Sequence, residues 1–294
     1  MSNPSPAAPE GMPGGIVPVR LPVVPVEIFA KRAARFRELA PGHATGDYLA
    51  ALAGLADAQR VACRGVQLAP SRDVFSPSVP RLAADWPRVD AWRRALGVIL
   101  SEMGKVPLPV PARAALDRLG GSASIELEAC ADALRAGVYD RIDPAAAPFV
   151  GAALQVYWTA LASAVPAEGL GDAEFGCPVC GSPPVAARVL GNDKLRYLVC
   201  SLCATEWHLT RLVCATCGAT GGVSYLAIEG DPAGVRAEAC GRCSTYLKLF
   251  YLEKSPSAEP FADDAATLSL DLLMSEEGYA RGGVNLFLLP GVNS

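Results

Sequence analysis

The sequence predicts an α+β protein in which an all-α N-terminal domain is followed by two duplicated β modules and a C-terminal helix. Three observations lead to this prediction. Between about residues 25 and 165, apolar residues recur at the three-to-four spacing of amphipathic helices. Residues 174–253 change to short alternating runs rich in β-branched and aromatic residues. Eight of the ten cysteines lie within residues 177–243, as four Cys-x-x-Cys pairs at regular intervals.

The composition excludes several classes of protein. The chain has 294 residues, of which 51% are hydrophobic, so it can bury a sizeable core and is not disordered as a whole. The net charge is −4, and residues 171–254 balance eight acidic with eight basic side chains. This balance leaves no basic stripe that could follow a phosphate backbone, so we expect no nucleic-acid partner.

Residues 1–22 are predicted to form a flexible N-terminal arm. They are rich in proline and glycine and lack the features of a secretory signal. The uncharged run 144–167 is long enough to span a bilayer, but Gln155, Thr159 and Ser163 form a polar stripe along one helical face. We therefore expect a buried helix, no membrane span and a cytoplasmic protein, in which clustered thiols indicate metal or redox chemistry.

Residues 23–170 are predicted to form the all-α domain. Pro25 can open its first helix, and Pro41 and Gly42 end it. The basic run 31–37 is interpreted as a solvated face of this helix. No phosphate-binding loop or paired-carboxylate motif occurs in the domain. The predicted helices cover residues 25–39, 47 onward, 86–104, 111–119, 122–136 and 144–165, with a Pro/Ser-rich loop at 68–80.

The rest of the chain is predicted to hold two metal modules, residues 171–212 and 213–256, and a C-terminal helix with an extended tail, residues 257–294. The helix is expected from about Asp263 to Glu277. Alternating or β-branched and aromatic runs predict strands at residues 195–200, 207–213, 223–229 and 246–251.

The cysteine pairs are the candidate metal ligands. Two residues between the cysteines of a pair let both thiolates reach one cation from a tight turn. Nineteen residues separate the first pair from the second and 22 the third from the fourth, whereas only ten separate the second from the third. The intervals therefore predict two four-sulfur sites, one made by Cys177, Cys180, Cys200 and Cys203, the other by Cys214, Cys217, Cys240 and Cys243.

The spacing leaves the metal open between iron and zinc. Both ions accept tetrahedral sulfur ligation. The first pair of each site is followed by a glycine, Gly181 or Gly218, and an aromatic residue follows each second pair. This arrangement suits a rubredoxin-type iron site as well as a zinc ribbon. A thioredoxin-like motif would open a helix after a strand, which none of these pairs is predicted to do.

The remaining cysteines and histidines have structural interpretations. Cys63 and Cys130 lie in apolar helices and are expected to be inert, buried thiols. His208 is expected to pack beside the first site, because four sulfurs already complete the coordination of one ion. His43 is interpreted as a solvated residue of a loop.

Taken in order, these motifs resemble the FdhE-type formate dehydrogenase accessory proteins. The resemblance rests on Cys-Pro-Val-Cys-Gly-Ser and Thr-Glu-Trp-His in the first module and Cys-x-x-Cys-x-Thr-Tyr-Leu-Lys in the second. It extends to the segments 32–40, 46–49 and 277–281, and so to nearly the whole chain beyond the first twenty residues. Leu286 stands where the family's Asn-Pro-Phe tail has proline.

The resemblance implies a non-enzymatic, cytoplasmic factor that acts on the catalytic subunit of respiratory formate dehydrogenase before export. It also implies two rubredoxin-like iron sites, carried by the same eight cysteines, and a homodimer. The alternatives are a rubredoxin-like electron carrier and a structural zinc-ribbon interaction protein whose metal only folds the domain.

Overall fold

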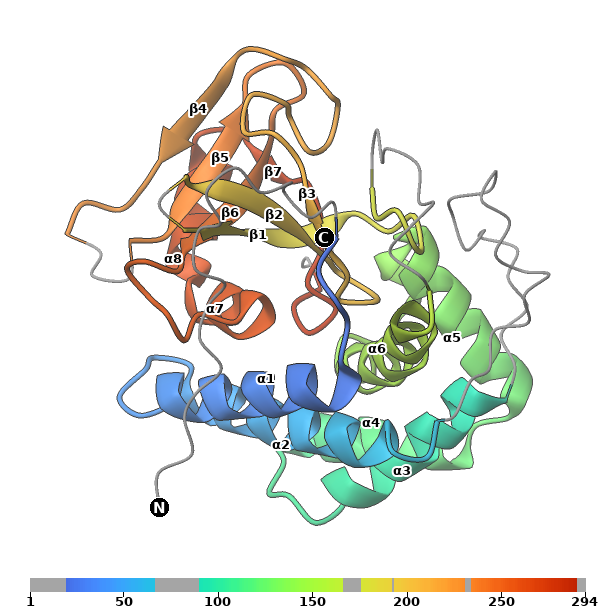
Figure 1. Ribbon diagram of the computed structural model, residues 1–294. Coiled ribbons are helices and arrows are strands. Elements are labelled where there is room, and N and C mark those ends of the chain that lie inside the picture. The colour runs from blue at the N-terminus through green and yellow to red at the C-terminus, as the bar shows by residue number, and fades with distance from the viewer. Residues whose placement is uncertain (1–19, 67–89, 166–175, 192, 231–233, 290–294) are drawn as a thin grey trace, which may run out of the picture.

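The computed structural model describes residues 20–66, 90–165, 176–191, 193–230 and 234–289. Helices fill the first part of these residues, one sheet follows, and two short helices come before the last strand of that sheet (Figure 1). The predicted α+β class is confirmed. The predicted division of the chain after residues 22, 170, 212 and 256 stays a prediction. Most of the arm, the Pro/Ser-rich loop and the boundary at residue 170 lie outside the described residues.

The helices of the N-terminal part follow the predicted pattern closely. Pro25 stands at the start of the first helix, where its fixed φ suits the helix and its missing N–H costs no hydrogen bond. Near the start of another, the Ala123 N–H donates to the Glu126 carboxylate over 3.0 Å. The helices are α1 (Pro25–Leu39), α2 (Gly46–Ala62), α3 (Ala91–Met103), α4 (Val110–Gly121), α5 (Ser124–Ala136), the 3-10 turn η2 (Tyr139–Arg141) and α6 (Ala147–Ser163).

Helix α6 is the buried centre of the helical part. All its side chains from Phe149 to Ala162 are buried. Gln155 accepts hydrogen bonds from Arg32 Nη1 (2.9 Å) and Gln59 Nε2 (3.0 Å), and it donates to the carbonyl of Ser201 (3.0 Å). The predicted buried helix is thus confirmed, but its polar stripe is a seam only at Gln155: the buried Thr159 hydroxyl has no partner among the described residues, and Ser163 is exposed. Among the described helices, none has the length and apolar character needed to cross a bilayer.

The interpretation of residues 31–37 as a solvated face is wrong for two of its arginines. Arg32 is fully buried, donates to Glu259 Oε1 over 3.0 Å, and places its guanidinium carbon 3.8 Å from the centre of the Phe261 ring. Arg35 binds both carboxylate oxygens of Asp263, at 2.9 and 2.6 Å. These partners lie 227 and 228 positions along the chain from the arginines, so a local window of sequence cannot reveal them.

The two β modules share one seven-stranded sheet. Its strands are β1 (Pro184–Leu190), β2 (Leu195–Cys200), β3 (Glu206–His208), β4 (Val223–Leu226), β5 (Arg236–Cys240), β6 (Thr245–Tyr251) and β7 (Ala280–Arg281). The order is β3-β2-β1-β6-β5-β4, with β7 beside β6. Neighbours within a module are antiparallel, and β1 joins β6 in parallel, with Ala187 opposite Leu249. Each module thus contributes three strands in the same order, which extends the duplication seen in the cysteine spacing.

Three strands, β1, β5 and the two-residue β7, are missing from the sequence prediction, and two predicted strands are shorter than expected. Strands β1 and β5 are rich in alanine and charged residues and have few of the β-branched and aromatic residues typical of strands, although both lie inside the sheet. The strand expected at 223–229 ends at Leu226. The strand expected at 207–213 ends at His208. Beyond it, the buried Arg196 donates to the carbonyls of Leu209, Thr210 and Val213, which turns this segment away from the ladder.

The expected C-terminal helix is divided into α7 (Pro260–Ala266) and α8 (Leu268–Glu276). The Thr267 hydroxyl donates to the Asp263 carbonyl over 2.8 Å at this break. Helix α7 packs against both α1 and β1, so it connects the helical part to the sheet (Figure 1). The tail then docks on this junction: Asn285 Nδ2 donates to the Phe261 carbonyl, and Phe287 is buried.

Candidate metal centres

The structure gathers eight cysteines into two clusters of four, in the grouping that the intervals predict. Within each cluster, the four Sγ atoms lie within 4.8 Å of one another. All ten cysteines of the chain are free thiols. The first cluster comprises Cys177, Cys180, Cys200 and Cys203, and the second comprises Cys214, Cys217, Cys240 and Cys243.

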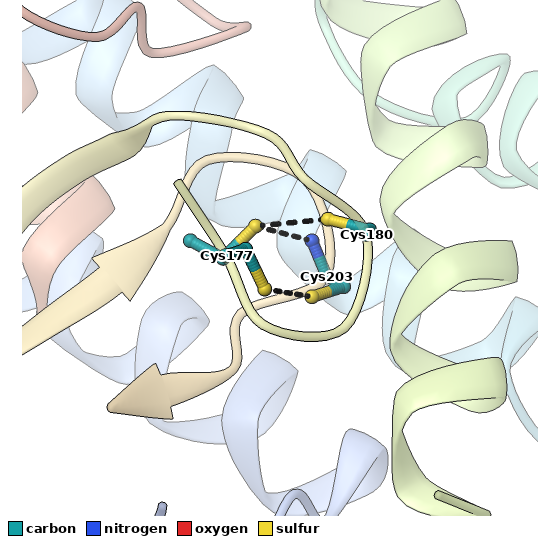
Figure 2. A group of neighbouring side chains, drawn as sticks. Cys177, Cys180 and Cys203 are labelled. Carbon is teal, nitrogen blue, oxygen red and sulfur yellow. Dashed lines mark hydrogen bonds between the residues drawn. The ribbon is translucent and has the colours of Figure 1, made fainter. Parts of the chain in front are cut away.

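The distances between sulfurs suit a tetrahedral ion. Ligand sulfurs about 2.3 Å from a central ion stand about 3.8 Å apart in a regular tetrahedron. In the second cluster, the Cys214–Cys243 and Cys217–Cys240 sulfurs are both 3.8 Å apart. The first cluster is slightly tighter, with Cys177 and Cys203 sulfurs 3.5 Å apart and pointing toward each other (Figure 2). Both quartets therefore have the size of an S4 metal site.

The backbone of each Cys-x-x-Cys turn is shaped to support its sulfurs. The Val179 N–H donates to Cys177 Sγ and the Thr216 N–H to Cys214 Sγ, each over 3.4 Å. Both turns close through a glycine at positive φ: Gly181 (75°) donates to the Cys177 carbonyl, and Gly218 (70°) makes the equivalent bond in the second cluster. Amide hydrogens directed at sulfur favour the thiolate over the thiol.

A threonine beside each cluster escaped the sequence analysis. Thr205 Oγ1 lies 3.0 Å from Cys203 Sγ, and Thr245 Oγ1 lies 3.1 Å from Cys243 Sγ. The residue between cysteine and threonine has positive φ in both modules, 54° at Ala204 and 53° at Ser244. The repeated Cys-x-Thr pattern was the available signal, and it marks two hydroxyls that can donate to a ligand sulfur.

Without a cation, these thiols would not all ionise. Burial raises the pKa of the Cys177 and Cys200 thiols well above the ordinary value, and it raises that of Cys214 to about 12. Against the effect of burial, backbone N–H groups of Cys243 and Arg242 lower the pKa of Cys240 to about 7. The donor set fits Zn²⁺ or iron, either of which would supply the positive charge that keeps four neighbouring thiolates deprotonated.

The two clusters differ in their access to solvent. The first belongs to the main hydrophobic core, and its Cys200 and Cys203 have no exposed surface. In the second, Cys217 and Cys243 are only half-buried. A cavity of about 10 Å³, lined in part by Cys214, Glu238 and Tyr246, adjoins the second cluster. This volume is about what one water molecule needs.

This difference predicts an order of metal loss. An excess of chelator should remove metal in two phases, the faster one from the second cluster, because its sulfurs are open to water and to attacking ligands. In alkylation followed by peptide mass spectrometry, Cys217 and Cys243 should be labelled before Cys200 and Cys203. Labelling of all four at one rate would contradict the assignment of the fast phase.

Other candidate residues lie outside the two clusters. His208 packs its ring edge-on against Tyr197, 5.7 Å between ring centres, and burial together with Arg196 lowers its pKa. His43 is half-buried rather than solvated, because its Nε2 lies 2.9 Å from the Ala266 carbonyl oxygen. Cys63 and Cys130 are only half-buried, not buried as expected, and this partial burial raises the pKa of both thiols. A raised pKa makes a thiol less reactive, in keeping with inert residues.

The fold and the clusters define a class: an α+β protein whose duplicated sheet presents two four-cysteine clusters suited to bind metal ions. The particular family follows from comparison with known proteins. The chain belongs to the FdhE family, since the models of the N-terminal, central and C-terminal domains of FdhE match residues 16–174, 176–211 and 212–288.

Relatives with known names agree with this assignment. A protein FdhE homolog of Stutzerimonas stutzeri is 42% identical over 286 residues, covering 91% of each chain. One of Edwardsiella ictaluri is 41% identical over 294 residues, covering 96% of this chain and 94% of the relative. The crystal structure of the FdhE protein from Pseudomonas aeruginosa matches with a TM-score of 0.81 at 35% identity, covering 93% of this chain and all of that one.

Proposed function

We propose that the chain is a non-enzymatic accessory factor in the formation of formate dehydrogenase, acting in the cytoplasm on the catalytic subunit before export. One observation carries this proposal: the FdhE family match extends through all three domains, over residues 16–288 with a single residue between the first two. The family's role supports the link to formate dehydrogenase. The division into a helical domain, two cysteine modules and a C-terminal segment is part of the same proposal.

Binding of the catalytic subunit can be tested by co-purification. The full-length tagged chain should retain the catalytic subunit of formate dehydrogenase. Two forms of that subunit are tested, one with its export peptide and one without it. An unrelated exported subunit carrying the same type of peptide serves as the control. Failure to retain the catalytic subunit in either form would contradict the proposal. Equal retention of the control subunit would show that the chain recognises only the export peptide and not the formate dehydrogenase subunit itself.

We further propose that each cysteine cluster binds one ion, iron in the redox-active form of the protein, with zinc as the alternative. Protein purified without oxygen should then contain two metal ions per chain by elemental analysis. Iron held by four sulfurs would give a visible absorption that is lost on reduction, whereas zinc would be colourless and redox-silent. A zinc-only protein would exclude a redox role for the sites but leave subunit binding untouched.

An electron carrier is the second candidate function. The half-buried Cys217 and Cys243 favour it, because electron transfer needs a centre close to the surface. Such a carrier should be reduced by a soluble reductase that is supplied with its electron donor, and reoxidised by an added electron acceptor, in the absence of any formate dehydrogenase subunit. Stoichiometric, lasting retention of the catalytic subunit would favour the accessory role instead.

A further inference from the structure

A buried arginine from the start of the described chain lies at the first cluster. Arg20 is 7% exposed, and its backbone pairs with Trp207 of β3 in an antiparallel bridge. Next to it, the Leu21 N–H donates to the Glu206 carbonyl over 3.0 Å. Arg20 Nη2 donates to the Ala162 carbonyl of α6 over 2.9 Å. The side chain therefore reaches from the edge of the sheet to α6, the helix that also contacts the first cluster through Ser201.

The rest of this guanidinium group has no hydrogen-bond partner. Arg20 Nε and Nη1 are both buried and unpaired within the described part of the chain, and none of the ion pairs found there includes Arg20. Buried side-chain donors normally have a partner, and a guanidinium stays charged in proteins. Burial lowers the pKa of Arg20, whereas negative charge on Cys203 and Cys177 opposes that change. The negative charges that act on Arg20 are thus those of two ligand sulfurs of the first cluster.

A metal ion in the first cluster would need such a charge. Four thiolates around a divalent ion leave a net charge of −2, and around a trivalent ion −1. The first cluster lies in the hydrophobic core, where water cannot solvate this charge, and burying an uncompensated charge is costly. At the second cluster the half-buried cysteines remain in contact with solvent.

We propose that Arg20 is the counter-charge of the first metal site, a positioning residue that stabilises the negatively charged metal–thiolate centre and slows loss of its metal. This inference rests on the metal binding proposed above. It gives the segment 20–22 a role that the interpretation as a flexible arm does not contain.

The test compares full-length variants loaded with Co²⁺. Arg20→Met removes the charge but keeps the apolar stem, and Arg20→Lys keeps the charge. The matched control is Arg188→Met, which removes a half-buried arginine of β1 that pairs with Glu206 of β3 across the intervening strand β2, 2.7 Å apart. The readouts are the slow phase of cobalt release to a chelator, the pH at which half of that cobalt is released, and the sulfur-to-cobalt absorption band.

Arg20→Met should accelerate the slow phase at least about tenfold, given the strength of charge-assisted contacts. It should also raise the pH of half-release and move the absorption band to longer wavelength, because thiolates that lose a nearby positive charge give up electrons more easily. The fast phase should not change, Arg20→Lys should restore most of the wild-type behaviour, and Arg188→Met should resemble wild type.

Wild-type kinetics and an unshifted band in Arg20→Met would overturn the inference, as would Arg20→Lys behaving like the methionine variant. If Arg20→Met does not fold, Arg20→Gln supplies the neutral side chain and the same criteria apply. A wild-type protein that takes up no cobalt at the first cluster would overturn the proposed metal binding, and this inference with it. A wild-type protein that takes up cobalt there, with an Arg20→Met variant that behaves like it, would overturn this inference alone.

Discussion

Serine in place of Cys200 should remove the first metal and unfold much of the protein, whereas serine in place of Cys243 should remove only the second metal. Cys200 is fully buried in the core beside α6, while Cys243 is half-buried in a small separate cluster. Structural metal sites contribute roughly 10–16 kcal/mol of binding free energy, against a total stability of about 5–15 kcal/mol. Loss of even part of this binding free energy at the first site is enough to unfold a domain.

Elemental analysis and thermal unfolding of the two variants check this prediction. Cys243→Ser should hold one metal ion per chain and unfold close to the wild-type temperature. Cys200→Ser should lose cooperative unfolding or show a far lower midpoint. The substitution is the same in both variants, so a difference between their unfolding midpoints reports the different surroundings of the two clusters. Equal midpoints would show that the first metal does not stabilise the core.

Methionine in place of Arg32 is expected to destabilise the protein by about 3–5 kcal/mol, the cost of breaking a buried ion pair by removing one partner. The change leaves the Glu259 carboxylate buried without its cation and takes one donor from Gln155. It also removes the guanidinium stacked on Phe261. Because Arg32 lies on α1 and Glu259 caps the start of α7, the loss should loosen the contact between the helical part and the sheet.

Denaturant unfolding gives the measurement, and Arg37→Met gives the matched control. Arg37 lies on the same helix, but its side chain is 56% exposed and pairs with Asp57 at the surface. Such a pair contributes about 0–1 kcal/mol. Adding Glu259→Gln to Arg32→Met should recover part of the lost stability, since the orphaned charge is then removed. Equal losses in Arg32→Met and Arg37→Met would refute this account of the buried pair.

The accuracy of the sequence prediction depended on whether the determining contacts are local. Helix α1 and strand β2 were predictable because their own residue patterns set them. The alanine-containing strand β1 could not be predicted in this way, because its place in the sheet comes from pairing with β6, about sixty residues later. The burial of Arg32 was not predictable for the same reason, since its carboxylate partner lies near the other end of the chain.

The cysteine clusters show the same difference between features set by local sequence, which were predictable, and features set by distant contacts, which were not. Each Cys-x-x-Cys turn is a local structure, and the regular intervals between turns were enough to group the eight sulfurs correctly. The unequal burial of the two clusters had no local signal. It arises because α6, which comes before both modules in the chain, packs on Ser201 through Gln155, while among the described residues the second cluster forms a small group outside the main core.

The parallel pairing of β1 with β6 also constrains the order in which a newly made chain can complete its sheet. Strands β1, β2 and β3 can pair through short connections as soon as residue 208 is available, but one side of β1 then stays open. It is covered only when Thr245–Tyr251 has been synthesised and has returned to it. Open strand edges attract other chains, and long-range parallel pairing forms slowly. The interval between these two events in translation is therefore the period in which the nascent protein is most exposed to aggregation.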